Sequence, residues 1–109
     1  MKNVAILGST GSVGKSTLDV IRHNREKFCV DLLTANKNYE LMIEQYNEFS
    51  PRYVYLEDLS AQKAFLDKVE KLQAGTLLLT SESDLNSVLS AQTTEIVVAA
   101  MVGVAGLKP

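Results

Sequence analysis

Several features that mark secreted, membrane or nucleic-acid-binding proteins are missing from this sequence. Its 109 residues include one cysteine, Cys29, so no disulfide can form within the chain. No long apolar run resembles a signal peptide or a membrane-spanning segment. The 11 Lys and Arg residues are scattered among 13 Asp and Glu, for a formal net charge of -2, which excludes a basic nucleic-acid-binding module. These absences predict a cytoplasmic protein with neither a nucleic-acid nor a membrane partner.

What is present is typical of one folded domain. Hydrophobic residues make up 46% of the chain and charged residues 22%, close to the average of globular proteins. No Gly/Ser linker, low-complexity tract or block of one charge divides the chain. The last segment, residues 101–109, begins where a further crossover would follow the last predicted strand. We therefore expect residues 1–109 to form a single domain that is truncated at its C-terminal end.

Apolar runs alternate with segments of helical spacing along the chain. The short apolar runs predict strands over Val4–Leu7, Cys29–Ala35, Tyr53–Leu56, Thr76–Leu79 and Ile96–Ala100. The segments between them predict helices over Ser12–Asn24 and Tyr39–Phe49, a third from an N-cap at Ser60 to Gly75, and a fourth capped by Ser81. Such alternation predicts a doubly wound α/β fold, with a mostly parallel sheet of about five strands and helices on both faces.

A glycine-rich loop, Gly8-Ser9-Thr10-Gly11-Ser12-Val13-Gly14, joins the first predicted strand to the first predicted helix. A parallel sheet places its ligand crevice at this point. Gly8 allows a sharp turn, Gly11 lets backbone N–H groups approach a pyrophosphate, and Gly14 allows the helix to pack close to the strand. Because the helix N-terminus offers free N–H groups and a partial positive charge, the loop predicts a dinucleotide site. A glycine-rich turn without a ligand is the simpler alternative.

The same loop partly matches the phosphate-binding loop of nucleotide hydrolases. Ser9–Ser16 reads Ser-Thr-Gly-Ser-Val-Gly-Lys-Ser against the pattern G-x-x-x-x-G-K-[ST], and only the first position differs. In that interpretation Lys15 reaches the terminal phosphates and Ser16 holds magnesium. Glu57 and Asp58 would offer carboxylates to the metal. The missing glycine falls at the turn, where a side chain hinders such a loop most, so the dinucleotide interpretation is favoured.

The residues after the second predicted strand indicate which dinucleotide binds. A site for NADH usually has an Asp or Glu there, which accepts hydrogen bonds from the ribose 2′-hydroxyl. Here the sequence after the strand runs Asn36-Lys37-Asn38, and no carboxylate occurs between Ala35 and Glu40. Lys37 supplies a cation and the asparagines supply amide donors for a 2′-phosphate, so NADPH is preferred over NADH. The simpler alternatives are a left-handed turn at Asn36, a helix N-cap at Asn38 and a solvated side chain at Lys37.

Other residues with chemical potential have structural explanations. His23 is expected to lie at the surface and to interact with the C-terminal end of the first helix. Cys29, at a strand start, is expected to be a small buried hydrophobe and not a nucleophile. Acidic residues at 57–58, 82 and 84 lie at helix starts, where capping and the helix dipole explain them. No catalytic or metal-binding residue is therefore predicted in this chain.

Four segments together resemble one enzyme family. The first is the glycine loop with the residues that follow it, Ser16–Val20 and Arg22–Asn24. The others follow in the same order, as Ala35–Asn38, Phe49–Tyr53, and Ala99–Gly103 with Ala105–Pro109. They closely resemble 1-deoxy-D-xylulose 5-phosphate reductoisomerase, the NADPH enzyme of the non-mevalonate isoprenoid pathway. The glycine loop alone is also similar to that of semialdehyde dehydrogenases, so the specificity of the match lies in the four segments together.

The resemblance implies a parent enzyme of bacterial or plastid type. Such an enzyme rearranges 1-deoxy-D-xylulose 5-phosphate and reduces the aldehyde intermediate with NADPH to 2-C-methyl-D-erythritol 4-phosphate, aided by a divalent metal, Mg or Mn. The resemblance also implies a homodimer, whose metal-binding and sugar-phosphate-binding groups belong to a later domain without a match here. This chain alone is then expected to bind the cofactor and not to catalyse the reaction.

The family pattern implies a set of cofactor contacts along NADPH. From the pyrophosphate through the adenosine 2′-phosphate to the nicotinamide, they are Gly8, Thr10, Gly11, Ser12 and Val13, then Asn36, Lys37 and Asn38, and finally Ala100 and Met101. Asn36 departs from the family, which typically has Gly at this position. The competing classes are a P-loop hydrolase, another NADP-dependent dehydrogenase such as a semialdehyde dehydrogenase, and a non-catalytic nucleotide-sensing module.

Overall fold

Strands and helices alternate throughout the computed structural model, which describes residues 2–69, 72, 75–90 and 96–99. In chain order the elements are β1 (Lys2–Leu7), α1 (Ser12–Arg22), β2 (Phe28–Ala35), α2 (Tyr39–Phe49), β3 (Tyr53–Leu56), α3 (Leu59–Val69), β4 (Leu77–Leu79), α4 (Glu82–Ser90) and β5 (Ile96–Ala99). The predicted α/β alternation is confirmed. None of the helices in the described part of the chain is long and apolar enough to cross a membrane.

The strands form one parallel sheet in the order β4-β3-β2-β1-β5. β1 lies between β2 and β5, with Leu7 opposite Thr34 on one side and Ala99 on the other. The first strands add outward from β1 to β4, and the chain then returns to the free side of β1, so the strand order reverses there. Open parallel sheets bind ligands outside the carboxyl ends of the strands at such a point, which is where the loop after β1 lies.

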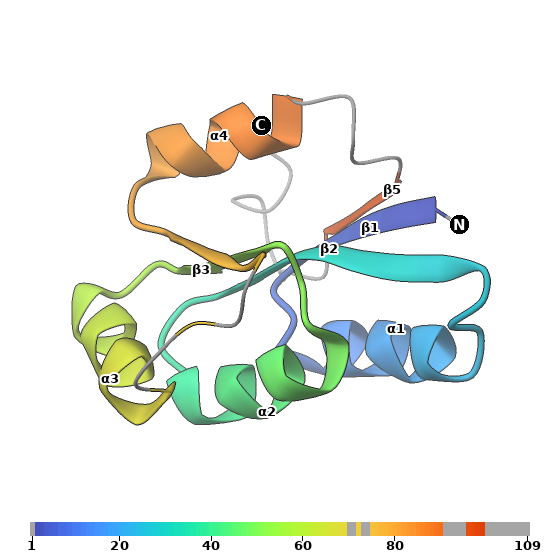
Figure 1. Cartoon of the computed structure of the whole chain (residues 1–109), viewed down its shortest axis with the longest axis horizontal. Coiled ribbons are helices and arrows are strands. Elements are labelled where there is room, and N and C mark those ends of the chain that lie inside the picture. Colours follow the sequence, from blue (N-terminus) through green and yellow to red (C-terminus); the bar gives the residue numbers. More distant parts are fainter. Residues whose placement is uncertain (1, 70–71, 73–74, 91–95, 100–109) are drawn as a thin grey trace.

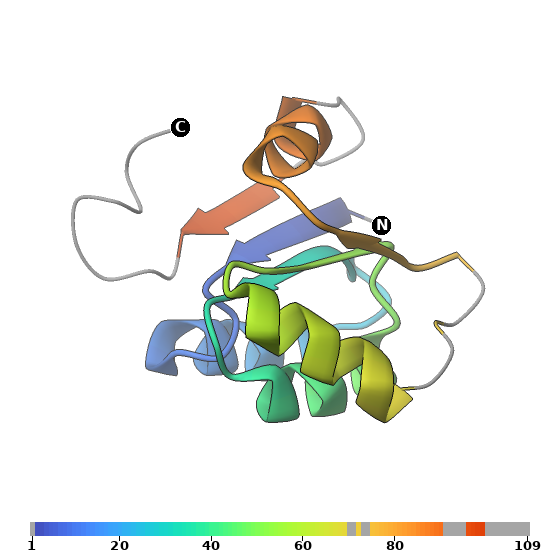
Figure 2. The same ribbon diagram turned by 90° about the vertical axis from the view of Figure 1, so that its left-hand side faces the viewer.

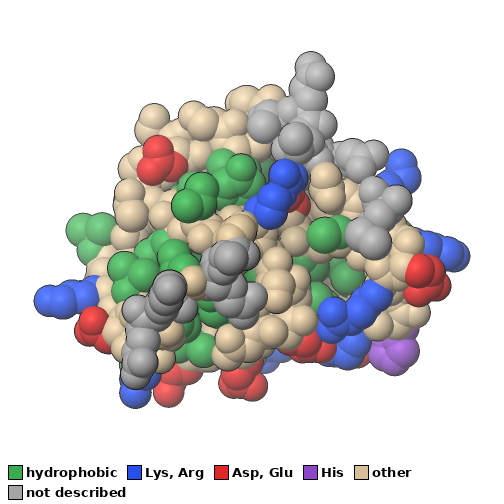
Figure 3. All heavy atoms as spheres, in the orientation of Figure 1, with side chains coloured by type: hydrophobic (Ala, Val, Ile, Leu, Met, Phe, Trp, Pro, Cys, Tyr) green, Lys and Arg blue, Asp and Glu red, His purple; other side chains and the backbone are tan. Residues whose placement is uncertain are grey.

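Helices cover both faces of the sheet, as a doubly wound fold requires. Helices α1, α2 and α3 lie along one face and α4 lies across the other (Figure 1). The view turned by 90° shows the same three layers (Figure 2). In the orientation of Figure 1, apolar side chains are exposed in the middle of the molecule, between the helical layers, and charges of both signs are mixed along the lower rim (Figure 3). The predicted Rossmann-like architecture is therefore confirmed.

Two clusters of buried side chains hold these layers together. The larger lies between the sheet and α1–α3, and contains Ile6, Leu33 and Tyr46 among its members. Within it, the rings of Tyr46 and Phe65 meet edge to face with centroids 5.4 Å apart, which joins α2 to α3. The smaller cluster lies under α4 and consists of Ala5, Leu32, Tyr55, Leu79 and Val88. The α1–α3 layer is therefore the more extensively packed one.

An irregularity in β2 places a carboxylate inside the fold. Val4 pairs with Val30 but Ala5 pairs with Leu32, so Asp31 is an extra residue in the β1–β2 register. The extra residue lets Val30 and Leu33 face the same cluster. Asp31 is 1% exposed, and its Oδ1 accepts a hydrogen bond from Nε of Arg52 at 2.5 Å. This bond raises the pKa of the Arg52 guanidinium, and it satisfies a charge that would be costly to bury alone.

The structure corrects two expectations about local environment. Cys29 is exposed, not buried. It alternates with Val30 and therefore faces the α4 side of the sheet, where the buried cluster does not reach the amino end of β2. The third helix begins at Leu59, and its N-cap is Asp58 and not Ser60, because Oδ2 of Asp58 accepts the Ala61 N–H at 2.9 Å.

The remaining predicted boundaries agree closely with the structure. Tyr39–Phe49 and Tyr53–Leu56 have the predicted bounds, and the first helix ends at Arg22, two residues before the predicted end at Asn24. Ser81 caps α4 as expected, since its Oγ accepts the Asp84 N–H at 3.2 Å. The third helix was predicted to run to Gly75, but α3 is described to Val69 and Leu72 lies outside any helix, while residues 70–71 and 73–74 fall outside the described part of the chain.

Candidate functional site

The glycine loop leaves β1 through contacts with the end of β2. Gly8 has a φ of 87°, in the left-handed region that favours glycine. Its N–H donates to both the backbone oxygen and the hydroxyl of Thr34, at 3.1 and 3.0 Å. The N–H of Ser9 donates to the same backbone oxygen at 2.8 Å. The predicted sharp turn at Gly8 is confirmed, and Thr34 fixes its starting point.

Gly14 lies where the loop folds back against the first turn of α1. A Cβ at this position would come within 2.4 Å of the Gly8 oxygen and 2.6 Å of Ser9 Cα. Both are backbone atoms of the loop itself, so neither can move aside without moving the loop. The predicted close packing of helix against strand end is confirmed, and it leaves no space for a side chain at Gly14.

Ser9 is held from the opposite side by a residue of α2. Its hydroxyl donates to Oε1 of Gln45 at 2.7 Å, and Nε2 of Gln45 donates to the Ser9 backbone oxygen at 2.8 Å. In the sequence, Gln45 shares the helical spacing of the apolar residues Met42, Tyr46 and Phe49, but nothing in the sequence gives a reason for a buried amide there. The only available signal was a polar residue at a position of apolar periodicity.

The N-terminus of α1 opens beyond this anchored segment. The helix begins at Ser12, and Gly11, at its N-cap position, provides no side-chain hydrogen bond. The first turn of α1 contains no acidic residue. The first N–H groups of a helix have no intrahelical acceptor and carry the positive end of the helix dipole. Ser12, Val13 and Lys15 are exposed, and Thr10 is half-buried. An anion can therefore approach the N–H groups of this turn.

The loop after β2 reaches the same edge of the sheet. Asn36, Lys37 and Asn38 are all exposed and lie at the carboxyl end of the strand next to β1. Oδ1 of Asn38 accepts the Leu41 N–H at 3.2 Å, which confirms Asn38 as the N-cap of α2. The side chain of Lys37 is free to face solvent or a ligand. The structure thus brings two of the three predicted contact regions together.

Asn36 does not adopt the left-handed conformation that was the simpler alternative to a ligand contact. Among the described non-glycine residues, only Ser50 has a positive φ. The Asn36 backbone oxygen instead accepts the Asp58 N–H at 3.0 Å, which ties the loop after β2 to the loop after β3. This bond holds the chain without a left-handed residue.

The third predicted contact region follows β5. Ala99 pairs with Leu7, so the carboxyl ends of β5 and β1 lie side by side. Ala100 and Met101, the residues predicted to lie along the cofactor toward the nicotinamide, fall outside the described residues.

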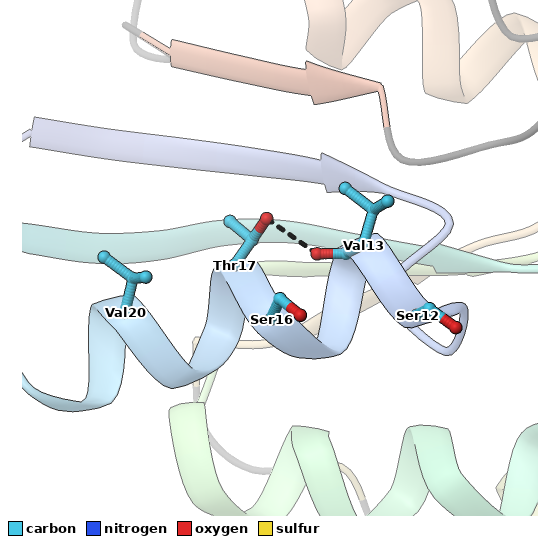
Figure 4. A pocket seen from close by; sticks show the side chains of 5 residues that line it. All are labelled: Ser12, Val13, Ser16, Thr17 and Val20. Carbon is cyan, nitrogen blue, oxygen red and sulfur yellow. Dashed lines mark hydrogen bonds between the residues drawn. The ribbon is translucent and has the colours of Figure 1, made fainter.

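A shallow hollow runs along the side of α1, away from its N-terminus. It is lined by Ser12, Val13, Ser16, Thr17 and Val20 (Figure 4). The hydroxyl of Thr17 donates to the Val13 oxygen at 2.8 Å, so it is already satisfied within the helix. Val13 and Val20 are 54% and 57% exposed, which makes this side of α1 largely apolar. The hydroxyls of Ser12 and Ser16 also line the hollow, and only its Ser12–Val13 end adjoins the glycine loop.

The geometry does not favour the P-loop alternative. Ser9 occupies the first glycine position of that motif, and its side chain is fully buried against Gln45. The carboxylates assigned to the metal follow β3, which is separated from β1 by β2. Asp58 is engaged as the N-cap of α3. Among the described residues, no group of three or more His, Cys, Asp or Glu side chains could hold a metal ion.

The shifted pKa values lie outside the glycine loop. Arg22 on α1 donates to both oxygens of Glu48 on α2, and this pairing lowers the pKa of the Glu48 carboxyl. Burial raises the pKa of Tyr55 on β3. His23 is exposed and its Nδ1 lies 2.8 Å from the Asp19 oxygen, which confirms the predicted contact with the helix C-terminus. Arg22 and Glu48 join α1 to α2, His23 lies at the end of α1, and Tyr55 belongs to the cluster under α4.

Comparison with known proteins identifies the family. The family model for 1-deoxy-D-xylulose 5-phosphate reductoisomerase matches residues 4–109. The reductoisomerases of Haemophilus ducreyi and Saccharophagus degradans are each 42% identical over the whole chain, which covers 28% of either protein. The chain thus spans little more than a quarter of the length of the curated relatives it matches.

Solved structures agree with the sequence relatives. A crystal structure of DOX-P reductoisomerase in complex with NADPH, fosmidomycin and magnesium is similar with a TM-score of 0.86 and 31% identity, over 98% of this chain and 26% of that one. The Zymomonas mobilis enzyme in complex with NADPH is similar with a TM-score of 0.82 and 26% identity, over 97% and 27%. These matches do not favour a P-loop hydrolase or a semialdehyde dehydrogenase. With its anchored glycine loop at the strand switch and a family match along nearly its whole length, the chain belongs to the 1-deoxy-D-xylulose 5-phosphate reductoisomerase family.

Proposed function

We propose that this chain is the NADPH-binding domain of an enzyme that converts 1-deoxy-D-xylulose 5-phosphate to 2-C-methyl-D-erythritol 4-phosphate. One observation carries the proposal: an open helix N-terminus and a loop with a lysine and no carboxylate side chain lie side by side at the carboxyl edge of the sheet. The solved relatives in complex with NADPH support it. The catalysed reaction is a property of the longer protein, of which this chain spans about a quarter.

The proposed pyrophosphate site consists of backbone donors. Gly8 turns the chain, and Thr10, Gly11, Ser12 and Val13 present N–H groups and small side chains to the anion. The absence of space for a Cβ at Gly14 supports this assignment, because the loop lies tightly against the helix that it precedes. A phosphate held in this way needs no positively charged side chain in the loop.

The proposed 2′-phosphate site consists of side chains. Lys37 contributes a cation, and Asn36 contributes its amide. Oδ1 of Asn38 is used in capping α2, so this residue would offer its amide nitrogen. NADPH supplies a hydride to the substrate when bound, and Ala100 and Met101 are proposed to lie toward the reacting nicotinamide. The divalent metal and the sugar-phosphate are proposed to bind groups outside these 109 residues.

We extend the proposal to the organisation of the protein. Residues 1–109 form the Rossmann-like cofactor domain, and the complete enzyme is a homodimer in the bacterial cytoplasm. The bacterial sources of the relatives support the bacterial assignment, and the buried cluster that joins α1, α2 and α3 to the sheet supports a cofactor domain; the homodimer rests on the family resemblance alone.

Calorimetric titration of the chain with NADPH, NADH and Mg-ATP in parallel tests the proposed function. We expect NADPH to bind more tightly than NADH and Mg-ATP not to bind. In Lys37→Ala, the loss of one charge-assisted phosphate contact should weaken NADPH about tenfold or more and NADH much less. Equal losses for the two cofactors would contradict the 2′-phosphate assignment, and binding of Mg-ATP alone would contradict the proposed function.

A further inference from the structure

Gln45 is the buried polar residue that joins α2 to the glycine loop. It is 5% exposed, and Ser9 is fully buried. The Ser9 hydroxyl donates to Oε1 of Gln45 at 2.7 Å, while Nε2 of Gln45 donates to the Ser9 oxygen at 2.8 Å. Because a backbone oxygen can only accept, only this orientation of the amide makes both bonds. The side chain of Gln45 therefore has one defined position.

These bonds complete the anchoring of Ser9. Its N–H donates to the Thr34 oxygen at 2.8 Å, and its oxygen and hydroxyl both bond to Gln45. The preceding residue, Gly8, is held by Thr34 as well. Thr10 and Gly11 thus continue from a segment whose polar groups are held by β2 on one side and α2 on the other.

Helix α2 also begins in the second loop of the site. Asn38 caps its N-terminus, and Gln45 follows seven residues later, about 10 Å along the helix axis. A rigid helix therefore carries one end of the loop at residues 36–38 and the anchor of the glycine loop. The relative position of the two loops is therefore fixed by α2 before a ligand binds.

We propose that Gln45 is a positioning residue for the cofactor, which holds the glycine loop in its binding shape through Ser9 without contacting the ligand. This inference rests on the proposed function of the loop as a pyrophosphate site. Recognition by backbone N–H groups depends on their direction, which a loose loop would not maintain. A loop that adopts the binding shape for only part of the time lowers the apparent affinity by that fraction.

The test compares Gln45→Leu with a control that loses a buried hydrogen bond elsewhere. The control is Thr76→Val, which removes the 2.6 Å bond from the Thr76 hydroxyl to the Pro51 oxygen near the amino ends of β3 and β4. Amide hydrogen exchange of Gly8 and Ser9 is measured without ligand, and NADPH affinity is measured by calorimetry. Gln45→Leu should accelerate exchange at both amides and weaken NADPH about tenfold, while Thr76→Val changes neither.

The outcomes separate the inference from the function on which it rests. Unchanged loop exchange in a folded Gln45→Leu protein would overturn the inference, as would faster loop exchange with an unchanged NADPH affinity. If the unmodified chain fails to bind NADPH, the proposed function is wrong, and the exchange data still decide whether Gln45 holds the loop. Should Gln45→Leu not fold, Gln45→Glu keeps an acceptor for the Ser9 hydroxyl but lacks the amide donor, and the same expectations apply to it.

Discussion

The two loops of the candidate site are built in opposite ways. The glycine loop is anchored by buried groups, with Ser9 enclosed between Thr34 and Gln45 and no space for a side chain at Gly14. The loop at 36–38 is exposed along its length and is held through the backbone bond from Asp58 to Asn36, by local backbone bonds at the start of α2 and by one helix cap. A site that recognises an anion by backbone N–H groups needs fixed geometry, whereas one that uses a flexible cationic side chain does not.

The largest expected effect comes from crowding the rigid loop. Gly14→Ala places a Cβ 2.4 Å from the Gly8 oxygen, so the loop and the helix must separate. We expect the free energy of unfolding to fall by about 3 kcal/mol and NADPH binding to be lost. Urea denaturation followed by circular dichroism measures the first, and calorimetry the second.

Gly75→Ala is the control for that variant. Gly75 has a φ of +91°, but an added Cβ would meet nothing within 4 Å. Only backbone strain is introduced, at a cost of about 1 kcal/mol. If the two glycine variants were equally stable, the lack of space for a Cβ at Gly14 would not be what destabilises Gly14→Ala.

An intermediate effect is expected in the exposed loop. Asn38→Ala removes the N-cap of α2 and should lower the free energy of unfolding by about 1 kcal/mol. It should also weaken NADPH more than NADH, because it removes an amide from the proposed 2′-phosphate site. Thermal unfolding and calorimetric titration with both cofactors measure the two effects.

Ser81→Ala provides the matched variant, since Ser81 caps α4 in the same way on the opposite face of the sheet. It should cost a similar stability, about 1 kcal/mol, with no change in cofactor affinity. A loss of affinity in Ser81→Ala equal to that in Asn38→Ala would show that affinity follows general stability, against a role of Asn38 in binding.

The smallest effect concerns the surface ion pairs between Glu48 on α2 and the arginines at the end of α1, which contrast with the buried hydrogen bonds between Gln45 and Ser9. Glu48 accepts hydrogen bonds from Arg22 and Arg25, which lower its carboxyl pKa. A group with a lowered pKa in the folded state contributes stability above its unfolded pKa of about 4.3, and this is lost as the pH falls through the folded pKa. Glu48→Gln should therefore be slightly less stable than the unmodified chain at pH 7.

The difference between Glu48→Gln and the unmodified chain should shrink as the pH falls below about 4, and it should also shrink in high salt because exposed ion pairs are screened. Urea denaturation over a pH series measures it. A difference that is independent of pH would show that the pair acts through packing against Phe49, over whose ring both Arg22 and Arg25 lie.

Much of this organisation is visible in local sequence. The helix Tyr39–Phe49 was predicted at its observed bounds because apolar periodicity, an N-cap asparagine and the Ser50-Pro51 stop agree with one another. The turn at Gly8 and the close packing at Gly14 follow from glycine spacing alone. Where local signals agree in this way, the structure repeats the prediction.

Local sequence was insufficient where a residue's environment is set by segments far from it in the chain. Cys29 was expected inside because its residue type is usually buried, but among the described elements no helix covers that end of the α4 face. The left-handed turn that was the simpler alternative for Asn36 does not form, and the Asn36 oxygen instead accepts the Asp58 N–H from another loop. Gln45 carried no functional signal, since its partner lies 36 residues earlier in the chain.

The sequence by itself determined the alternation of strands and helices, the glycine loop and the absence of a carboxylate between the end of β2 and Glu40, because periodicity, glycine and charge are properties of the residues where they stand. Only the tertiary structure decided that β5 pairs with the free side of β1, that Gln45 hydrogen-bonds to Ser9, and that the loops after β1 and β2 lie at the same carboxyl edge of the sheet. Those features depend on which surfaces pack together, and packing joins residues that are far apart in the chain.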